Sequence, residues 1–319
     1  MRTLVVGAGA IGGYFGGRLL EAGRDITFLV RPRRAAELAR DGLRIQSRMG
    51  DVTIAAPPAV LPENLKDTFD LVLLALKAYD LEGALKSCAP AVGPHTAILP
   101  LLNGMRHLEV LDERFGKARV LGGACVIAAT LNEKHAILHL NESHTLSFGE
   151  RDGAMSTRVE DIASLMAGAR FDARARTTIL LDMWEKWVFL ATLAGSTCLM
   201  RGAIGDIAAA PGGMDFVLGL LEECRGVAAA EGYAPRPVFL ESVRRTLTTE
   251  GSPLTASMLR DIENGSPIEA DHVIGDLLRR GHGGAILPIV YAHLKTYEAR
   301  CGAPSKTHSG RPILAAAAF

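Results

Sequence analysis

Apolar runs of strand length alternate with amphipathic segments along the first half of the chain. Residues 4–6, 26–30, 70–76 and 96–102 are almost wholly apolar, which is typical of strands buried on both faces of a parallel sheet. Segments with apolar residues at helical spacing follow, and Gly23 is placed to end the first of them. This repetition of strand, turn and helix predicts an α/β fold with a Rossmann-type, doubly wound sheet.

Further strand-like runs complete this half of the chain. They are predicted at residues 43–46, 52–55, 120–131, 136–140, 145–148 and 171–174. We expect the runs between residues 120 and 148 to form an antiparallel finish to the same sheet, with a helix at 155–167 behind them.

The pattern changes from about residue 177, where strand-like alternation gives way to long helical periods separated by Gly and Pro turns. Helices are predicted at residues 179–200, 213–231, 238–248, 257–264, 268–280 and 287–300. We therefore divide the chain into a Rossmann domain over residues 1–175 and an all-helical domain over residues 176–319. The alanine run at residues 315–318 is expected to be a frayed tail.

Composition and charge narrow the class of protein. The chain has 319 residues, and its 35 Lys and Arg are balanced by 35 Asp and Glu, so no global field attracts nucleic acid or an anionic membrane. No run reaches the 18 or so apolar residues that a membrane span needs. The five cysteines are scattered without a C-x-x-C pair, which argues against a disulfide framework and favours the cytoplasm.

The histidines do not suggest a metal site. His135, His139 and His144 are nearest one another, but their spacing is not typical of metal ligands. We expect these side chains on the solvent side of edge strands, and we expect no bound metal.

The turn after the first strand carries the chemistry of a dinucleotide site. Gly7, Gly9 and Gly12 form G-x-G-x-x-G, with Ala10 and Ile11 inside the motif, where a helix should begin. The first glycine permits the tight turn, the second lets backbone approach a pyrophosphate, and the third lets the helix lie close to the strand. The motif is weak alone, but the strand before it and the helical pattern after it supply its context.

The residue after the second strand indicates which dinucleotide binds. Enzymes for NAD usually carry Asp or Glu there, whereas this chain has Arg31, with Arg33 and Arg34 close behind. Arginine can pair with a ribose 2′-phosphate, so the sequence predicts NADP(H). The alternative is a solvated basic turn at the start of a helix.

Other polar residues should share that crevice. Lys77 and Asn103 each follow an apolar strand run, and ligands of parallel sheets bind beyond the carboxyl ends of the strands. We therefore expect both residues beside the glycine turn and Arg31.

Three residues of the helical half could do chemistry. Lys186 lies in a segment that is apolar on almost every side, and a buried ammonium is costly unless it is used or paired. It could serve as a proton donor, reach the surface, or pair with Asp182 or Glu185. Glu269 and Ser257 could act on a substrate or simply stabilise helix starts.

The chain as a whole resembles the ketopantoate reductases (2-dehydropantoate 2-reductases, the PanE/ApbA family). The resemblance rests on the order and spacing of several motifs: Gly7-Ala-Gly-Ala-Ile-Gly-Gly, Leu76-Lys-Ala, Asn103-Gly-Met, Trp184-Glu-Lys, Ser257-Met-Leu-Arg-Asp-Ile and Ile268-Glu-Ala-Asp. It implies a Rossmann domain, a helical domain and a site between them. The family reduces 2-dehydropantoate with NADPH on the way to pantothenate and coenzyme A.

The resemblance also implies roles for individual residues. Lys186 becomes the general acid, Glu269 a hydrogen-bond partner of the substrate hydroxyl, and Ser257 a ligand of its carboxylate. Asn103 would touch both cofactor and substrate, while Arg31 and Lys77 would lie along the nucleotide. The partner is then a small 2-oxo acid. The oligomeric state stays open, with a homodimer as the candidate.

One departure from the family pattern affects the substrate. The family has asparagines four and eight residues after the lysine, where this chain has Leu190 and Ala194. Thr197, on the same helix face, could replace one of them as a substrate ligand. Two further interpretations are therefore kept: a related reductase of another 2-oxo acid, and a sensor that binds NADP(H) without catalysis.

Overall fold

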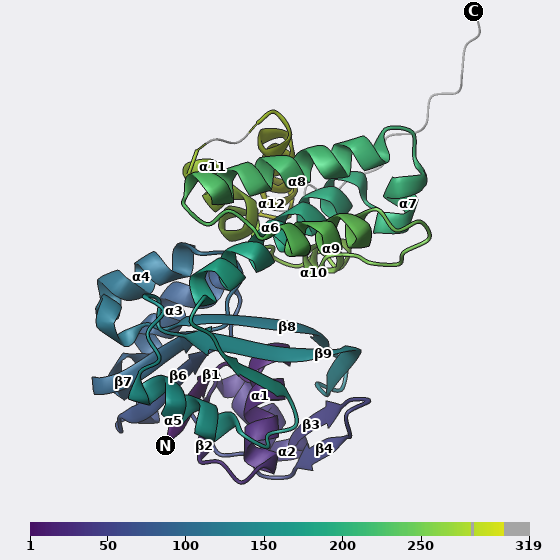
Figure 1. Ribbon diagram of the computed structural model, residues 1–319. Helices are drawn as coiled ribbons and strands as arrows, with labels where there is room; N and C mark the ends of the chain where they lie inside the picture. The colour runs from purple at the N-terminus through teal and green to yellow at the C-terminus, as the bar shows by residue number, and fades with distance from the viewer. Residues whose placement is uncertain (282–283, 303–319) are drawn as a thin grey trace, which may run out of the picture.

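A computed structural model describes residues 1–281 and 284–302 of the chain (Figure 1). The alanine run at residues 315–318 lies outside the described residues. Strands dominate the N-terminal part and helices the C-terminal part, which lies at the opposite end of the molecule in Figure 1. The prediction of an α/β half followed by a helical half is confirmed.

The first sheet is wholly parallel and carries the glycine turn. Its strands lie in the order β5 (Ala59–Val60), β2 (Ile26–Leu29), β1 (Thr3–Val6), β6 (Phe69–Leu74) and β7 (Val92–Pro100). All four residues of β1 are buried, because β1 pairs with β2 on one side and with β6 on the other. The strand order therefore reverses beside β1, and the crevice at such a switch point is where parallel sheets bind ligands.

Short helices connect these strands. The α-helices of this half are α1 (Ala10–Glu21), α2 (Pro32–Asp41), α3 (Leu81–Cys88), α4 (Arg106–Phe115) and α5 (Thr157–Met166). Single 3₁₀ turns lie at η1 (Pro62–Asn64), η2 (Ala78–Asp80), η3 (Ala89–Ala91) and η4 (Lys117–Arg119).

The later strands form a second sheet, so the expectation of an antiparallel finish to the first sheet is wrong. The second sheet contains β3 (Leu43–Gln46), β4 (Val52–Ile54), β8 (Gly122–Leu131), β9 (Ile137–Gly149) and β10 (Asp172–Ala175). The two strands expected at 136–140 and 145–148 are the single strand β9, which pairs antiparallel with β8 and parallel with β3 and β10. Alternation along a strand shows that it is half buried but does not identify its partner.

Helix α1 lies between the two sheets. A Cβ at Gly16 would come within 2.6 Å of Phe28 in the first sheet, and a Cβ at Gly13 within 2.6 Å of Ile137 in the second. Glycine on both faces of α1 therefore permits the close approach of both sheets.

The histidines of β9 are also placed differently from expectation. His139 is buried, with Nδ1 2.9 Å from Ser47 Oγ, and His144 Nδ1 lies 2.8 Å from Tyr14 Oη. Because β9 is an interior strand, these side chains pack against α1 instead of pointing into solvent. His135, in the turn before β9, is partly exposed.

The helical half is organised around one long helix, α6 (Ile179–Met200), which contacts helices of its own half and also β8. The other helices are α7 (Ile204–Ala209), α8 (Gly213–Ala230), α9 (Pro237–Leu247), α10 (Ser257–Glu263), a π-helical turn η5 (Asp271–Gly275), α11 (Asp276–Arg279) and α12 (Ile286–Gly302). The six predicted helices are present, the fifth as η5 with α11, and α7 was not predicted. The domain boundary at residue 175 stays a prediction, within the connection between β10 and α6.

Two negative findings concern only the described residues. No helix among them combines the length and apolarity needed to cross a bilayer. No three of their His, Cys, Asp or Glu side chains are grouped so that they could hold a metal ion.

Candidate active site

A cavity of about 720 Å³ brings most of the predicted site residues together. It is lined by residues from both halves of the chain, including Gly7, Gly9, Ala10, Ile11, Arg31, Lys77, Asn103, Lys186, Ser257 and Glu269. The predicted residues that do not line it are Gly12 and Thr197. The cavity thus joins the carboxyl end of the parallel sheet to helices α6 and α10.

The glycine turn is shaped for a phosphate group. Gly7 has a φ of +95°, and a Cβ at Gly12 would lie 2.0 Å from the Gly7 carbonyl oxygen, so larger residues are excluded at both positions. A Cβ at Gly9 would meet nothing within 4 Å, which leaves open space on the cavity side. Gly9 precedes α1 and provides no side-chain cap, so first-turn amides remain free to bind an anion. These features fit a dinucleotide pyrophosphate.

The arginines of the basic turn after β2 differ in their ion-pair partners and in whether they line the cavity. Arg31 is largely exposed, lines the cavity and pairs with Asp80. Arg33 is exposed, does not line the cavity and pairs with Glu37.

Arg34 also lines the cavity, although the sequence analysis mentioned it only as an arginine close behind Arg31. Its Nε donates to the Ala8 carbonyl at 2.9 Å and its Nη1 to Glu37 at 3.2 Å, while its buried Nη2 has no partner among the described residues. The available signal was its position in the first turn of α2, whose N-cap is Arg31.

Lys77 links the two halves of the chain across the cavity. Its Nζ lies 2.8 Å from Asp261 Oδ2 and 3.4 Å from Glu269 Oε2. Burial alone would lower the pKa of Lys77, but the two carboxylates outweigh burial and raise it. The other oxygen of Glu269 accepts a hydrogen bond from the backbone of Ala78 at 2.9 Å.

Lys186 of α6 lines the cavity, and the sequence left open whether it pairs with a neighbouring acid. Asp182 and Glu185, the two candidates, pair with Arg236 instead, and Asp182 also pairs with Arg176 at 2.7 Å. Burial alone would raise the pKa of Asp182, but hydrogen bonds from both arginines hold it below its usual value. Within the described part of the chain, Lys186 takes part in no ion pair, and it lines the cavity.

The positions that depart from the family pattern differ in their exposure to the cavity. Leu190 and its neighbour Phe189 line it, whereas Ala194 is buried in the helical core. Thr197 is fully buried: its hydroxyl donates to the Leu193 carbonyl at 2.8 Å and accepts from the backbone of Ala256 at 3.3 Å. In this structure Thr197 therefore holds the start of α10 and does not face the cavity.

Two residues of α10 also line the cavity. Ser257 is the first residue of α10 and lines the cavity, with Ala256 as the helix cap. Arg260, one turn later, also lines it, and the sequence analysis did not name it as a site residue.

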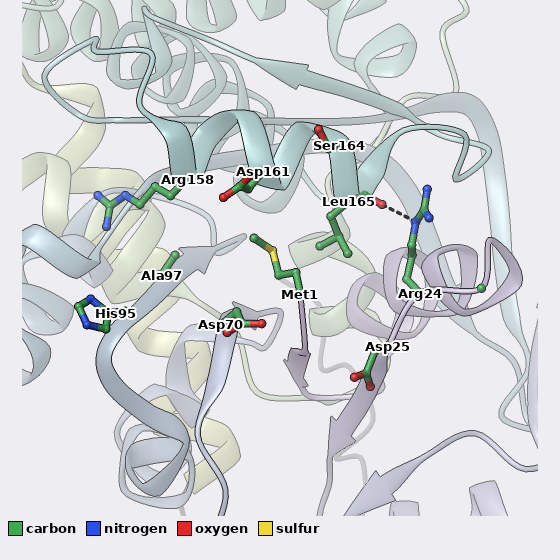
Figure 2. Close-up of a pocket in the computed structure, with 11 residues that line it drawn as sticks. Met1, Arg24, Asp25, Asp70, His95, Ala97, Arg158, Asp161, Ser164 and Leu165 are labelled. Carbon is green, nitrogen blue, oxygen red and sulfur yellow. Dashed lines mark hydrogen bonds between the residues drawn. The ribbon is translucent and has the colours of Figure 1, made fainter.

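A second cavity, of about 740 Å³, lies near the amino ends of β1, β6 and β7 (Figure 2). Its two arginines already have partners: Arg24 donates to the Leu165 carbonyl, and Arg158 pairs with Glu150. None of the predicted site residues lines it.

Models of known protein families match both halves of the chain. The model described as ketopantoate reductase PanE/ApbA matches residues 3–153, and the model described as ketopantoate reductase PanE/ApbA C terminal matches residues 178–287. The chain is also similar to the uncharacterized oxidoreductase YkpB of Bacillus subtilis. The two are 38% identical over 303 residues, which is 94% of this chain and 99% of YkpB.

The chain is also similar to solved structures. A crystal structure of 2-dehydropantoate 2-reductase from Geobacter metallireducens GS-15 matches with a TM-score of 0.84 and 28% identity, covering 93% of this chain and 99% of that one. The ternary structure of D-mandelate dehydrogenase with NADH and anilino(oxo)acetate matches with a TM-score of 0.85, covering 95% and 100%. At 19% identity, this second likeness concerns the fold alone.

Proposed function

Because the chain belongs to the ketopantoate reductase PanE/ApbA family of NAD(P)-dependent oxidoreductases, we propose that it reduces a 2-oxo acid to the 2-hydroxy acid with NADPH. One observation carries this proposal. Lys186, which has no acidic partner among the described residues, lines the same cavity as the glycine turn and Arg31. Carbonyl reduction requires a hydride donor and a proton donor, and a bound dinucleotide and an ammonium group in one cavity would supply them.

The reaction divides between cofactor and protein. Bound NADPH supplies the hydride that the ketone carbon receives. Lys186 stabilises the negative charge that develops on the ketone oxygen and then gives that oxygen a proton. The neutral amine regains its proton from solvent before the next turnover.

The remaining predicted residues bind and orient the reactants. Gly7, Gly9, Ala10 and Ile11 would hold the pyrophosphate, Gly12 would let the turn lie close to the helix, and Arg31 would bind the ribose 2′-phosphate. Lys77 and Asn103 would lie along the nucleotide, with Asn103 also reaching the substrate, and Ser257 would bind the substrate carboxylate.

Glu269 is proposed to accept a hydrogen bond from a substrate hydroxyl. Both of its oxygens already have partners, Ala78 and Lys77. A substrate hydroxyl would therefore have to share this carboxylate with Lys77.

Two substrates are proposed. The first is 2-dehydropantoate, the substrate that gives the family its name. The second is a 2-oxo acid with an apolar side chain, and a specific observation favours it: Leu190 and Phe189 present apolar groups to the cavity. A polar group of the substrate left unpaired there would cost roughly 1–3 kcal/mol.

The test is NADPH oxidation against 2-dehydropantoate and a panel of branched and aromatic 2-oxo acids. Lys186→Met should lower kcat by about 10²- to 10⁴-fold while the Kd for NADPH stays unchanged. Lys66→Met, at an exposed lysine, is the matched control. Near-normal turnover of Lys186→Met would refute the general-acid role, and tight NADPH binding without turnover of any 2-oxo acid would favour the sensor interpretation.

A further inference from the structure

Arg260 and Ser257 lie on the same face of α10. They are three residues apart in the helix Ser257–Glu263, and both line the cavity that contains Lys186. Residues three apart are neighbours on a helix surface, so the hydroxyl and the guanidinium reach the same part of the cavity. Arg260 itself is partly buried.

The other cations of the cavity are mostly neutralised. Five basic side chains line it: Arg31, Arg34, Lys77, Lys186 and Arg260. Arg31 pairs with Asp80, Arg34 with Glu37, and Lys77 with Asp261 and Glu269. Among the residues that the structure describes, Lys186 and Arg260 are the two of these five that have no acidic partner.

A 2-oxo acid matches this pair of charges. It carries a carboxylate next to a ketone whose oxygen becomes negative during reduction, so two positive groups are needed. We infer that Arg260 binds the substrate carboxylate, together with Ser257, while Lys186 faces the ketone oxygen; this inference rests on the proposed function. A planar guanidinium can engage both carboxylate oxygens at once.

This assignment also determines which residues the substrate's side chain would contact. With the carboxylate bound at α10 and the ketone at Lys186, the side chain is left with the apolar wall of Phe189 and Leu190. Arg260 therefore selects for the acid group, and this wall selects for an apolar side chain.

The experiment compares the best 2-oxo acid of the panel with its 2-oxo amide, which lacks the negative charge. For wild type, the amide should have a KM about 10- to 100-fold higher than the acid, since a charge-assisted bidentate pair is lost. Arg260→Gln should raise the KM for the acid by a similar factor, change kcat little and reduce the difference between acid and amide. Arg260→Lys should recover part of the loss.

Control variants distinguish carboxylate binding by Arg260 from a role in stability or in NADPH binding. Arg260 makes no side-chain hydrogen bond to the rest of the described chain, so Arg260→Gln should keep the thermal stability of wild type. Arg245→Gln, at an exposed arginine of α9, should change none of the constants. The calorimetric Kd of the 2-hydroxy acid product should rise in Arg260→Gln, whereas the Kd of NADPH should not.

Two results would overturn the inference. An unchanged KM for the acid, with weaker NADPH binding, would assign Arg260 to the nucleotide. A preserved preference for acid over amide in Arg260→Gln would assign the carboxylate to other residues. Failure of wild type to reduce any 2-oxo acid would instead refute the proposed function, and the inference with it.

Discussion

Lys186 lacks a counter-ion in the cavity because Arg236 takes the nearby acids. The backbone nitrogen and Nε of Arg236 both donate to Glu185 Oε1 at 2.8 Å, and its Nη2 lies 2.6 Å from Asp182. Asp182 is four residues before Lys186 and so shares its side of the helix, which makes it the acid that would otherwise pair with the ammonium. A contact more than fifty residues away in sequence thus keeps the proposed proton donor free.

Arg31 provides a test of cofactor choice at the scale of one residue. Arg31→Ala should lower the ratio of kcat/KM for NADPH to kcat/KM for NADH by about 10- to 100-fold, because a charged hydrogen bond to phosphate contributes about 1.5–3 kcal/mol. Steady-state kinetics with both cofactors measure this ratio. Arg33→Ala, which removes an arginine that does not line the cavity, should leave this ratio unchanged. Equal ratios in wild type and Arg31→Ala would contradict the assignment.

His107 gives a prediction about stability and pH. It is fully buried, neither ring nitrogen has a partner among the described residues, and burial, with nearby positive charge, lowers its pKa from 6.5 to about 3. Between pH 6.5 and pH 3 the unfolded chain therefore binds a proton that the folded chain does not, so this residue reduces stability as the pH falls through that window.

His107→Gln should make the free energy of unfolding less dependent on pH in this window. Chemical denaturation at several pH values measures the slope, and His95→Gln, at an exposed histidine, is the control. A slope as steep as that of wild type would show that His107 is not the group responsible.

At the scale of elements, the loop between β7 and α4 packs closely against the helical half. Gly104 has a φ of +77°, and a Cβ there would lie 2.5 Å from the backbone oxygen of His272 in η5. This loop also carries Asn103, so its packing positions a cavity residue.

Gly104→Ala should therefore lower the free energy of unfolding by about 2–4 kcal/mol, from backbone strain together with the forced contact. Gly232→Ala is the matched variant, because Gly232 has a φ of +86° but open space at its Cβ position. Urea denaturation should show a smaller loss for Gly232→Ala, of about 1–2 kcal/mol. Equal losses would mean that the contact with η5 contributes nothing.

Elements defined by local pattern could be predicted from the sequence, and those defined by distant partners could not. The β1 strand, the glycine turn and helix α6 follow from apolar runs, glycine spacing and helical period within their own residues. The assignment of β9 to a second sheet depends on pairing with β3, about ninety positions earlier. Thr197 faces away from the cavity because its hydroxyl binds Ala256, 59 residues later.

At the scale of the whole molecule, two groups of ion pairs connect the halves within the described part of the chain. Glu109 of α4 pairs with Arg279 and Arg280, and Lys77 pairs with Asp261 and Glu269. The first group lies outside the cavity lining, whereas the second includes lining residues. We therefore expect ligand binding to disturb the second group and leave the first in place.

Asp261→Asn tests this expectation. Loss of the 2.8 Å pair with Lys77 should lower the stability of the ligand-free protein by about 0.5–1 kcal/mol, because the pair is partly exposed. It should also release Lys77 for the nucleotide and lower the Kd for NADPH severalfold. Thermal unfolding and calorimetry measure the two effects. Unchanged stability together with an unchanged Kd would show that the pair does not restrain the cavity.

The two tryptophans of the chain flank the proposed proton donor in the sequence of α6. Trp184 and Trp187 have ring centroids 4.8 Å apart, the first stacks on Tyr233, and the indole of the second donates to Val273 at 2.9 Å. All indole emission of this protein therefore originates within one turn of α6 from the proposed proton donor. Reduced nicotinamide absorbs light in the range where indoles emit, so quenching by energy transfer should provide a label-free optical signal of coenzyme occupancy.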